Sequence, residues 1–392
     1  MKFSIMRRID FTVGFLLCGF LALVSKTGRK NKHNPSLPQN LNEKKLLLMK
    51  FLGFGSILMT TPMIRELKRN YPSCKIHFLT FKSNIQVCHS IPFIDKTLYL
   101  EKDSYWKFLL SFFKCLLRIR REDYEVVFNL EFFSNFSLFL SSLSGARQVV
   151  CFGGRHEYRK TLCQHIVSYE NKTHVVSKFY NFARVFISSL SEDDKRLTLL
   201  EEDHKAKERI ITLFKDYHIQ PEQDFLVVVN INASEMSVIR KWPFEYYQKV
   251  ILYLLEIKGV KIILIGAKED ISYVSQLERK IRNKDRVINL AGQISIKELI
   301  SLLKQSHLYL GNDSGPLHIA EACEVPSISF FGPESPDVYG HSSDKNTIFY
   351  SNLPCSPCLN VYTNKDTRCK RNLCLEKITP EQVIKVLQKK YF

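Results

Sequence analysis

Short apolar runs alternate with longer segments of helical character along most of the chain, and this alternation limits the possible fold more than any other feature. Each run holds four to eight residues rich in Val, Ile, Leu and Phe, as expected of a strand buried on both faces of a sheet. Strands separated by helix-length segments predict βαβ units and a parallel sheet. The predicted strands are residues 45–51, 75–80, 97–100, 125–130, 225–230, 260–266, 286–290, 307–311 and 325–332.

The strand rhythm restarts at residue 225, which predicts two doubly wound α/β domains rather than one. A chain of 392 residues with 45% hydrophobic residues is long enough to bury two such cores. We expect an N-terminal Rossmann-like domain over residues 44–218 and a C-terminal one over residues 222–392, joined near residues 216–223.

Residues 1–43 predict a segment that associates with a membrane. The first fifty residues hold ten Lys or Arg and two acids, which favours an anionic partner. The apolar run 11–24 is fourteen residues long, whereas a spanning helix needs about twenty. We therefore expect a helix lying on the inner face of the cytoplasmic membrane, followed by a linker over residues 31–42; a cleaved signal or a short anchor are the alternatives. The flanking basic residues are Arg7, Arg8, Lys26, Arg29, Lys30 and Lys32.

The eleven cysteines, several of them within apolar or helical patterns, favour a reducing cytoplasm over a secreted disulfide scaffold. Four of them form a C-x2-C-x10-C-x4-C pattern near the C-terminus that could bind structural zinc. Disulfides, an iron–sulfur cluster and free thiols are the competing interpretations. The four residues are Cys355, Cys358, Cys369 and Cys374.

The stretch YLGNDSGPLHIAEACEVPSISFFGP, residues 309–333, places a dense group of polar and turn-forming residues at the end of a predicted strand. Asp313 or Ser314 can cap the helix that follows, Gly315 lets a ligand approach the backbone, and Pro316 suits the first turn. Free N–H groups at such a helix start bind a diphosphate, and His318 could add a further donor. The alternative is an ordinary capped turn.

This stretch resembles the hallmark segment of glycosyltransferase family 9, the ADP-heptose:lipopolysaccharide heptosyltransferases and their relatives. Residues 46–80 are similar to the family's first strand, glycine turn and T-T-P helix. Residues 227–250 are similar to the opening of its second domain, with the basic-Trp-Pro element as RKWP. Residues 124–147 and 289–306 also match, so the resemblance runs from about residue 46 to 389.

The resemblance implies an α/β protein of the GT-B fold, with two facing Rossmann-like doubly wound domains that bind the acceptor and the nucleotide sugar, respectively. It implies an inverting enzyme that moves heptose or a related sugar from an ADP-heptose-like donor to a lipopolysaccharide-type glycolipid or surface-glycan acceptor. A catalytically silent nucleotide-sugar-binding relative is the alternative. A nucleic-acid partner is not expected, because the basic excess lies beside the apolar segment and no aromatic-basic motif is present.

The chain contains no D-x-D sequence, so we expect metal-independent transfer without a catalytic cofactor. The diphosphate charge would then be met by a helix N-terminus and basic side chains. Arg240 and Lys241 occupy the family's basic element, and which of them serves stays open; a solvated basic pair is the other interpretation. The remaining expected nucleotide contacts are Ala233 and Ser234 in the phosphate loop and residues 266–269, from Gly266 to Glu269.

The turn LGFGSILMTTP departs from the family at one position. The family places an aspartate there, taken to be the general base that deprotonates the acceptor hydroxyl, and this chain has Ser56. A serine hydroxyl cannot accept that proton near neutrality, so Ser56 would cap the following helix or bind a sugar hydroxyl. We expect Glu131, which follows a predicted strand, to be the relocated base; a solvated loop glutamate is the alternative.

Overall fold

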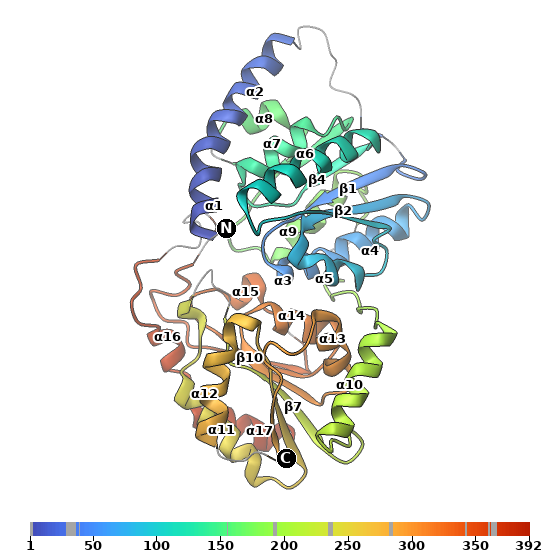
Figure 1. Cartoon of the computed structure of the whole chain (residues 1–392). Coiled ribbons are helices and arrows are strands. Elements are labelled where there is room, and N and C mark those ends of the chain that lie inside the picture. The colour runs from blue at the N-terminus through green and yellow to red at the C-terminus, as the bar shows by residue number, and fades with distance from the viewer. Residues whose placement is uncertain are drawn as a thin grey trace. The chain divides into compact units, whose positions relative to one another are not determined.

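Two six-stranded parallel sheets organise the chain into two units, Met1–Thr198 and Leu199–Phe392 (Figure 1). This computed structural model describes residues 3–28, 37–38, 40–154, 156–190, 194–233, 238–281, 285–341, 343–359, 361 and 367–392. The predicted pair of doubly wound α/β domains is confirmed.

The sheet of the first unit has the strand order β3-β2-β1-β4-β5-β6, and every neighbouring pair is parallel. The four strands predicted for this unit are present, whereas β5 and β6 were not predicted. Strand β5 lies next to β4, and β6 lies next to β5 at the edge of the sheet. The strands are β1 Lys45–Met49, β2 Lys75–Phe81, β3 Lys96–Leu100, β4 Val126–Asn129, β5 Gln148–Phe152 and β6 His165–Val167.

The sheet of the second unit has the order β12-β11-β10-β7-β8-β9, which is the same topology. The five strands predicted here are present. The unpredicted edge strand β12 is only half-buried, so its sequence lacks a continuous apolar run. The strands are β7 Phe225–Asn230, β8 Val260–Leu264, β9 Val287–Asn289, β10 Leu308–Asn312, β11 Ser327–Phe331 and β12 Asn346–Tyr350.

Helices cover both faces of each sheet, as a parallel sheet requires. In the first unit, α6 and α7 share one hydrophobic cluster, and α4 packs with α9. Its helices are α1 Phe3–Ile9, η1 Asp10–Gly14, α2 Phe15–Gly28, α3 Phe54–Leu58, α4 Thr61–Asn70, η2 Lys82–Asn84, α5 Ile85–His89, α6 Tyr105–Arg121, α7 Asn135–Leu143, α8 Tyr158–Leu162 and α9 Val175–Arg184.

In the second unit, α11, α12 and α17 bury their apolar sides in one cluster, while α13 packs with both α10 and α14. Its helices are α10 His204–Asp216, η3 Val238–Arg240, α11 Phe244–Glu256, η4 Lys268–Asp270, α12 Ile271–Ile281, α13 Ile296–Lys304, α14 Gly315–Ala322, α15 Pro336–Tyr339, α16 Leu373–Glu376 and α17 Pro380–Lys390.

The boundary between the units lies at Thr198 and Leu199, not near residues 216–223 as expected. Helix α10 belongs to the second unit because it packs on α13. Lys297 Nζ lies 2.6 Å from the Asp203 carboxylate, and Lys304 Nζ donates to the Leu200 carbonyl oxygen at 2.7 Å. The expected domain 44–218 therefore ends about twenty residues too late.

The N-terminal helical segment runs from residue 3 to residue 28 through α1, η1 and α2. Ile5–Ser25 is the one helix in the described part of the chain that is long and apolar enough to cross a membrane. The expected length of fourteen residues is therefore wrong, because the helix continues into the residues on both sides of the apolar run. By length and composition, the segment is not too short to span a membrane.

This segment packs on the first unit through a face of small residues. Gly14 and Cys18 lie against α7, where a Cβ on Gly14 would stand 2.8 Å from the Asn135 Cβ and Cys18 Sγ donates to the Asn135 carbonyl oxygen. The Asp10 carboxylate accepts from the Phe136 N–H at 2.5 Å. A carboxylate at the start of α7 is favourable because the helix N-terminus carries unpaired N–H groups. Residues 3–28 are therefore part of the first unit, not a separate segment.

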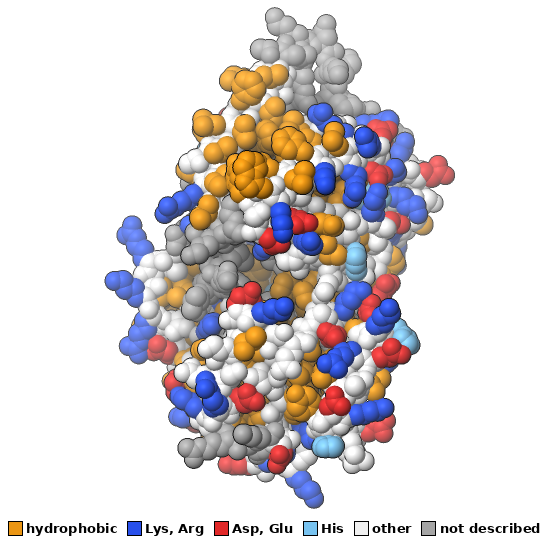
Figure 2. Space-filling view, viewed as in Figure 1, with side chains coloured by type: hydrophobic (Ala, Val, Ile, Leu, Met, Phe, Trp, Pro, Cys, Tyr) orange, Lys and Arg blue, Asp and Glu red, His pale blue; other side chains and the backbone are white. Residues whose placement is uncertain are grey.

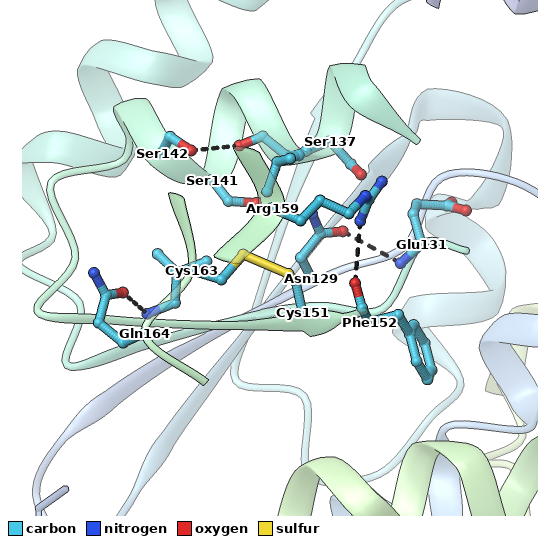
Figure 3. The surroundings of a disulfide bond; sticks show 12 residues. Asn129, Glu131, Ser137, Ser141, Ser142, Cys151, Phe152, Arg159, Cys163 and Gln164 are labelled. Atoms are coloured by element: carbon cyan, nitrogen blue, oxygen red, sulfur yellow. Dashed lines mark hydrogen bonds between the residues drawn. A yellow bond between two sulfur atoms is a disulfide. The ribbon is translucent and has the colours of Figure 1, made fainter. Parts of the chain in front are cut away.

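One disulfide joins Cys151 on β5 to Cys163, which follows α8 (Figure 3). This pair was not predicted from the sequence. The other nine cysteines are free. A single pair is not a disulfide scaffold, so the fold rests on its two hydrophobic cores.

Candidate active site

The two sheets share a topology that creates a switch point at the same place in each. The strand order reverses between β1 and β4 in the first unit and between β7 and β10 in the second. In open parallel sheets, ligands bind beyond the carboxyl ends of the strands at such points. The residues after these four strands are therefore the candidate site residues.

The residues expected to bind a diphosphate form the turn between β10 and α14. Asp313, Ser314 and His318 are buried, whereas Gly315 and Pro316 are partly exposed at the start of the helix. Ser314 is the N-cap by position, but its hydroxyl does not cap α14; it accepts a hydrogen bond from Asn230 Nδ2 at 3.0 Å. The capping role expected of Asp313 or Ser314 is wrong: Ser314 bonds to Asn230 at the end of β7, and Asp313 pairs with Arg240 on η3.

The sequence did not decide between Arg240 and Lys241 as the basic residue of the site, and the structure gives the two side chains different partners. Arg240 Nη1 lies 3.2 Å from Asp313 Oδ2, and both side chains are largely buried. Lys241 Nζ instead lies 4.1 Å from the ring centre of Tyr273 on α12. Arg240 is therefore the basic residue that contacts the turn at α14.

Trp242 anchors the segment that carries Arg240. Its side chain is fully buried and stacks on Phe330 with 4.1 Å between ring centres. The Trp242 backbone N–H donates to Asn312 Oδ1 at 2.8 Å, and its indole N–H donates to the Ile378 carbonyl oxygen at 2.9 Å. The residue two positions after Arg240 is thus fixed to both β10 and the C-terminal region.

Three buried asparagines connect the strand ends around the switch point, and none of them was predicted as a site residue from the sequence. Asn312 Nδ2 donates to the Asn232 carbonyl oxygen at 3.1 Å, and Asn232 Nδ2 donates to the Ile265 carbonyl oxygen at 3.2 Å. Asn230 holds Ser314, as described above. An asparagine that ends an apolar strand is the signal that could have revealed them, because a buried amide requires hydrogen-bond partners.

The other predicted nucleotide contacts differ in their surroundings. Ala233 is partly exposed directly after Asn232, and Ser234 lies outside the described residues. Gly266 follows β8, where a Cβ would stand 2.8 Å from Asn232 Nδ2, so a side chain there would displace the asparagine network. Glu269 is exposed on η4. Ala233 and Gly266 therefore border the switch point, while Glu269 lies on an exposed turn.

His318 belongs to a group of three titratable side chains behind the turn. Its Nδ1 lies 2.9 Å from Glu321 Oε2, and its Nε2 lies 3.9 Å from Asp313 Oδ1. His341 Nε2 lies 3.8 Å from the same Glu321 oxygen. His318, Glu321 and His341 form the one group within the described residues whose three ligand atoms lie within 4.8 Å of one another, the spacing that a metal ion needs.

In the first unit, Glu131 and Lys50 form a buried ion pair at the switch point. Glu131 Oε2 accepts from Lys50 Nζ at 2.9 Å, and the two side chains are 5% and 2% exposed. Glu131 Oε1 accepts the backbone N–H groups of Phe51 and Leu52 at 2.6 and 2.8 Å. Glu131 lies at the expected sheet edge but is not a solvated loop glutamate. Its carboxylate is engaged in holding the chain just before the glycine turn.

Ser56 lies in the first turn of α3, whose N-cap is Gly53. Gly53 has a φ of +73°, a left-handed conformation that glycine adopts without strain. A Cβ on Gly53 would lie 3.5 Å from Ser56 Oγ. The expectation that Ser56 caps the following helix is wrong; its partly exposed hydroxyl lies beside the glycine turn.

The four cysteines of the tail lie near one another in the second unit. Burial raises the pKa of the Cys358 thiol, and the neighbouring Cys369 and Cys355 raise it further. Burial likewise raises the pKa of Cys374 to about 11, with Cys358 and Cys369 contributing. Cys369 Sγ donates to the Arg371 carbonyl oxygen at 3.0 Å. Among the described residues, these thiols do not form a group with metal-ligand spacing.

Comparison with known proteins agrees with the architecture of the two units. The model of glycosyltransferase family 9 (heptosyltransferase) matches residues 112–367. Lipopolysaccharide heptosyltransferase 3 of Escherichia coli K12 is 26% identical over 289 residues, which cover 71% of this chain and 79% of that protein.

Two solved structures are also similar. One is Escherichia coli ADP-heptose lipopolysaccharide heptosyltransferase II, with a TM-score of 0.69, 18% identity, and coverage of 88% of this chain and 98% of that one. The other is the dodecameric iron-containing heptosyltransferase TibC of enterotoxigenic E. coli in complex with ADP-D-β-D-heptose, with a TM-score of 0.53, 13% identity, and coverage of 89% and 77%.

The family match spans well over half of the chain and includes the turn at α14, the RKWP segment and, of the four tail cysteines, Cys355 and Cys358. The chain therefore belongs to glycosyltransferase family 9, the heptosyltransferases, and is a glycosyltransferase of the GT-B fold.

Proposed function

We propose that this enzyme transfers heptose or a related sugar from an ADP-heptose-like donor to a lipopolysaccharide-type acceptor, with inversion at the anomeric carbon and without a metal at the reaction centre. The observation that carries this proposal is the contact between Arg240 and Asp313 at the start of α14. It places a cation beside a helix N-terminus at a topological switch point. This combination suits the diphosphate of a nucleotide sugar.

In the proposed reaction, the acceptor hydroxyl oxygen bonds to the anomeric carbon and releases its proton to water, while the bond from that carbon to the diphosphate oxygen breaks. The leaving diphosphate gains negative charge, which Arg240 and the N–H groups of α14 stabilise. Asp313 orients the guanidinium. His318 donates from Nδ1 to Glu321, so its Nε2, on the side of Asp313, can donate to the same anion when the ring carries both protons.

Arg240→Met and Lys241→Met form a matched pair that tests the donor site. We expect Arg240→Met to weaken ADP binding at least about tenfold, since a charge-assisted hydrogen bond contributes about 1.5–3 kcal/mol. Lys241→Met should bind ADP normally because its ammonium lies on Tyr273. Titration calorimetry with ADP measures both. Equal effects of the two variants would contradict the assignment.

Gly315→Val provides a second test of the same site. A β-branched side chain at the first residue of α14 would obstruct the approach of a phosphate to the backbone. We expect ADP binding to be lost while the thermal unfolding temperature is kept. ADP affinity that stays unchanged would remove α14 from the donor site.

Metal independence is tested by chelation. His318, Glu321 and His341 have the spacing of metal ligands, so a metal ion required for transfer would have a place to bind. We expect transfer to continue after treatment with EDTA and gel filtration. Activity that is lost and then restored by one divalent cation would overturn this part of the proposal.

For the acceptor side, we propose that Ser56 contacts the acceptor and that Glu131 is a positioning residue. Three donors already occupy the Glu131 carboxylate, and a carboxylate offers about four acceptor sites. This revises its expected role as the general base. Under this proposal Glu131→Gln disturbs the turn, so it raises the acceptor KM and lowers stability while the pH profile of kcat is kept. A basic limb of the kcat profile that disappears in Glu131→Gln would restore Glu131 as the base.

A catalytically silent nucleotide-sugar-binding protein is the second candidate, because the aspartate position is Ser56. A mass-spectrometric screen of donors with a purified lipopolysaccharide-core acceptor separates the two. Transfer of any sugar supports the enzyme. ADP-heptose binding without transfer or donor hydrolysis supports the silent relative.

For the cysteine tail, we propose that Cys355, Cys358, Cys369 and Cys374 bind a structural metal, zinc or iron, and that binding draws the four thiols closer together than they lie in this structure. The C-x2-C pair suits a tetrahedral thiolate site, and TibC contains iron. Elemental analysis of anaerobically purified protein for both metals tests this. About one metal ion per chain is expected, and Cys355→Ser should lower that content while Cys74→Ser should keep it. The absence of a stoichiometric metal ends the proposal.

We also propose that the enzyme works at the inner face of the cytoplasmic membrane, held by residues 3–28. Membrane fractions washed with alkaline carbonate distinguish the modes of attachment. Release indicates a helix lying on the surface, and retention indicates a spanning helix. A full-length protein that remains soluble in low salt would contradict membrane attachment.

A further inference from the structure

Helix α6 carries two apolar faces, of which one is directed away from the protein. Phe112, Cys115 and Ile119 are buried in the hydrophobic cluster of the first unit. On the other side of the helix, a second set of large apolar residues is 58–78% exposed. Their spacing of four, three and four residues places them in one stripe along the helix. These residues, the α6 stripe, are Trp106, Leu110, Phe113 and Leu117.

A row of basic side chains runs beside the α6 stripe. The row is shifted by one residue around the helix, and all of its members are exposed. The seventeen residues of α6 contain no Asp or Glu. A water-facing helix usually mixes both charges, whereas apolar and purely basic rows side by side are typical of a helix in a membrane interface. The basic row is Lys107, Lys114, Arg118 and Arg121.

The α6 stripe lies on the same side of the first unit as the N-terminal helix. The buried residues Cys18 and Ala22 of α2 and Phe112 of α6 belong to one hydrophobic cluster. Beyond that cluster, α2 exposes Leu16, Phe20 and Leu23 among others. Figure 2 shows the hydrophobic side chains gathered over these two helices, with Lys and Arg at their margin. An exposed apolar area of this extent marks an interaction surface.

We propose that the α6 stripe inserts into the interfacial region of an anionic phospholipid bilayer beside the N-terminal helix. Three observations favour a bilayer over a protein partner. The neighbouring helix is long and apolar enough for a membrane. The basic row can reach anionic headgroups while its aliphatic stems lie on the apolar surface. Tyr105 and Trp106 stand at the start of α6, and these residue types prefer the membrane interface.

This second contact gives the first unit a fixed orientation on the membrane, which a single helix would not provide. It extends the membrane location proposed above and does not depend on sugar transfer. Its failure is therefore distinguishable from failure of the proposed reaction, because ADP binding and transfer are measured separately.

Trp106 makes the test direct. The chain has two tryptophans; Trp106 is 78% exposed, and Trp242 is fully buried in the other unit. Full-length protein is mixed with vesicles of phosphatidylglycerol and phosphatidylethanolamine. We expect the tryptophan emission to shift to shorter wavelength and to be quenched by brominated lipids. Trp106→Phe should abolish both changes, because Trp242 does not report on the surface.

A double variant, Leu110→Glu with Phe113→Glu, should lose the blue shift and the bromolipid quenching while the protein still sediments with vesicles through residues 3–28. The matched control is Leu252→Glu, which changes an exposed leucine on α11 of the other unit and should keep both signals. Circular dichroism checks that each variant is folded.

Two results would overturn the proposal. One is a vesicle-bound protein in which iodide still quenches Trp106 as it does in solution. The other is shielding of Trp106 by self-association in the absence of lipid, which sedimentation velocity would reveal and which would assign the stripe to a second copy of the chain.

Discussion

Lys50 and Glu131 form a buried ion pair that joins the ends of the two central strands of the first unit, with Lys50 following β1 and Glu131 following β4. The same carboxylate accepts two backbone N–H groups of the chain that leads into the glycine turn. The ion pair therefore holds in place the chain segment that leads into the glycine turn.

We expect Lys50→Met to destabilise the protein by about 3–5 kcal/mol, because it leaves a buried carboxylate without its cation. Urea denaturation measures the loss. The double variant Lys50→Met with Glu131→Gln should be less destabilised than the sum of the single variants, since it removes the unpaired charge. Strict additivity would show that the two side chains do not interact in solution.

Asn312→Leu should reduce both stability and ADP affinity. The substitution leaves the buried Trp242 N–H without an acceptor, at a cost of about 1–3 kcal/mol. It also loosens the segment that carries Arg240. Asn289→Leu is a matched control, because Asn289 ends β9 and accepts from the Ala291 N–H; it should lower stability while ADP binding is kept. Calorimetry and urea denaturation of both variants provide the comparison.

Glu122 predicts a specific pH dependence of stability. Hydrogen bonds from Lys45 and Lys96 lower its pKa from 4.5 to about 2. Because the folded-state pKa is depressed, the stabilisation is complete above pH 4.5 and is lost as pH falls toward 2.

Glu122→Gln should thus cost about 1–2 kcal/mol near pH 7, after allowance for the partly exposed lysines. The difference between the two proteins should shrink toward pH 2. A difference that does not change with pH would contradict the ion pairs.

Cys163→Ser should lower the free energy of unfolding by about 2–3 kcal/mol under oxidising conditions, because the disulfide closes a loop of roughly a dozen residues. With a reductant, the wild-type protein and the variant should have similar stability. Denaturation with and without dithiothreitol tests this. A loss that persists under reducing conditions would indicate a packing effect of the cysteine side chain rather than the cross-link.

The sequence predicted those parts of the fold that have a local signal. Strands β7 and β10 are buried on both faces, form continuous apolar runs and were found, whereas β5 was missed although all of its residues are buried. Strand β12 was missed because its residues are half-buried. Helix α10 was assigned to the wrong unit because its amphipathic pattern shows that it packs, but not against which sheet.

The sequence predicted which motifs form the candidate site, but not which side chains contact one another within it. The turn from Asp313 to His318 was located correctly at the end of a strand. The choice between Arg240 and Lys241 depended on Asp313 and Tyr273, which lie far away in the sequence. The partners of Glu131 are about eighty residues upstream. Such pairings follow from tertiary structure, so a pattern in one segment cannot reveal them.

The cysteine tail is hydrogen-bonded to the backbone on either side of Arg240. Asn372, two residues before Cys374, donates through Nδ2 to the carbonyl oxygens of Ile239 and Lys241, which flank Arg240. Any chemistry that moves the tail, such as alkylation, oxidation or exchange of a bound metal, would thus alter the backbone that presents the guanidinium. If Arg240 binds the donor as proposed, a thiol reagent that reacts with the tail would weaken ADP binding without entering the switch point.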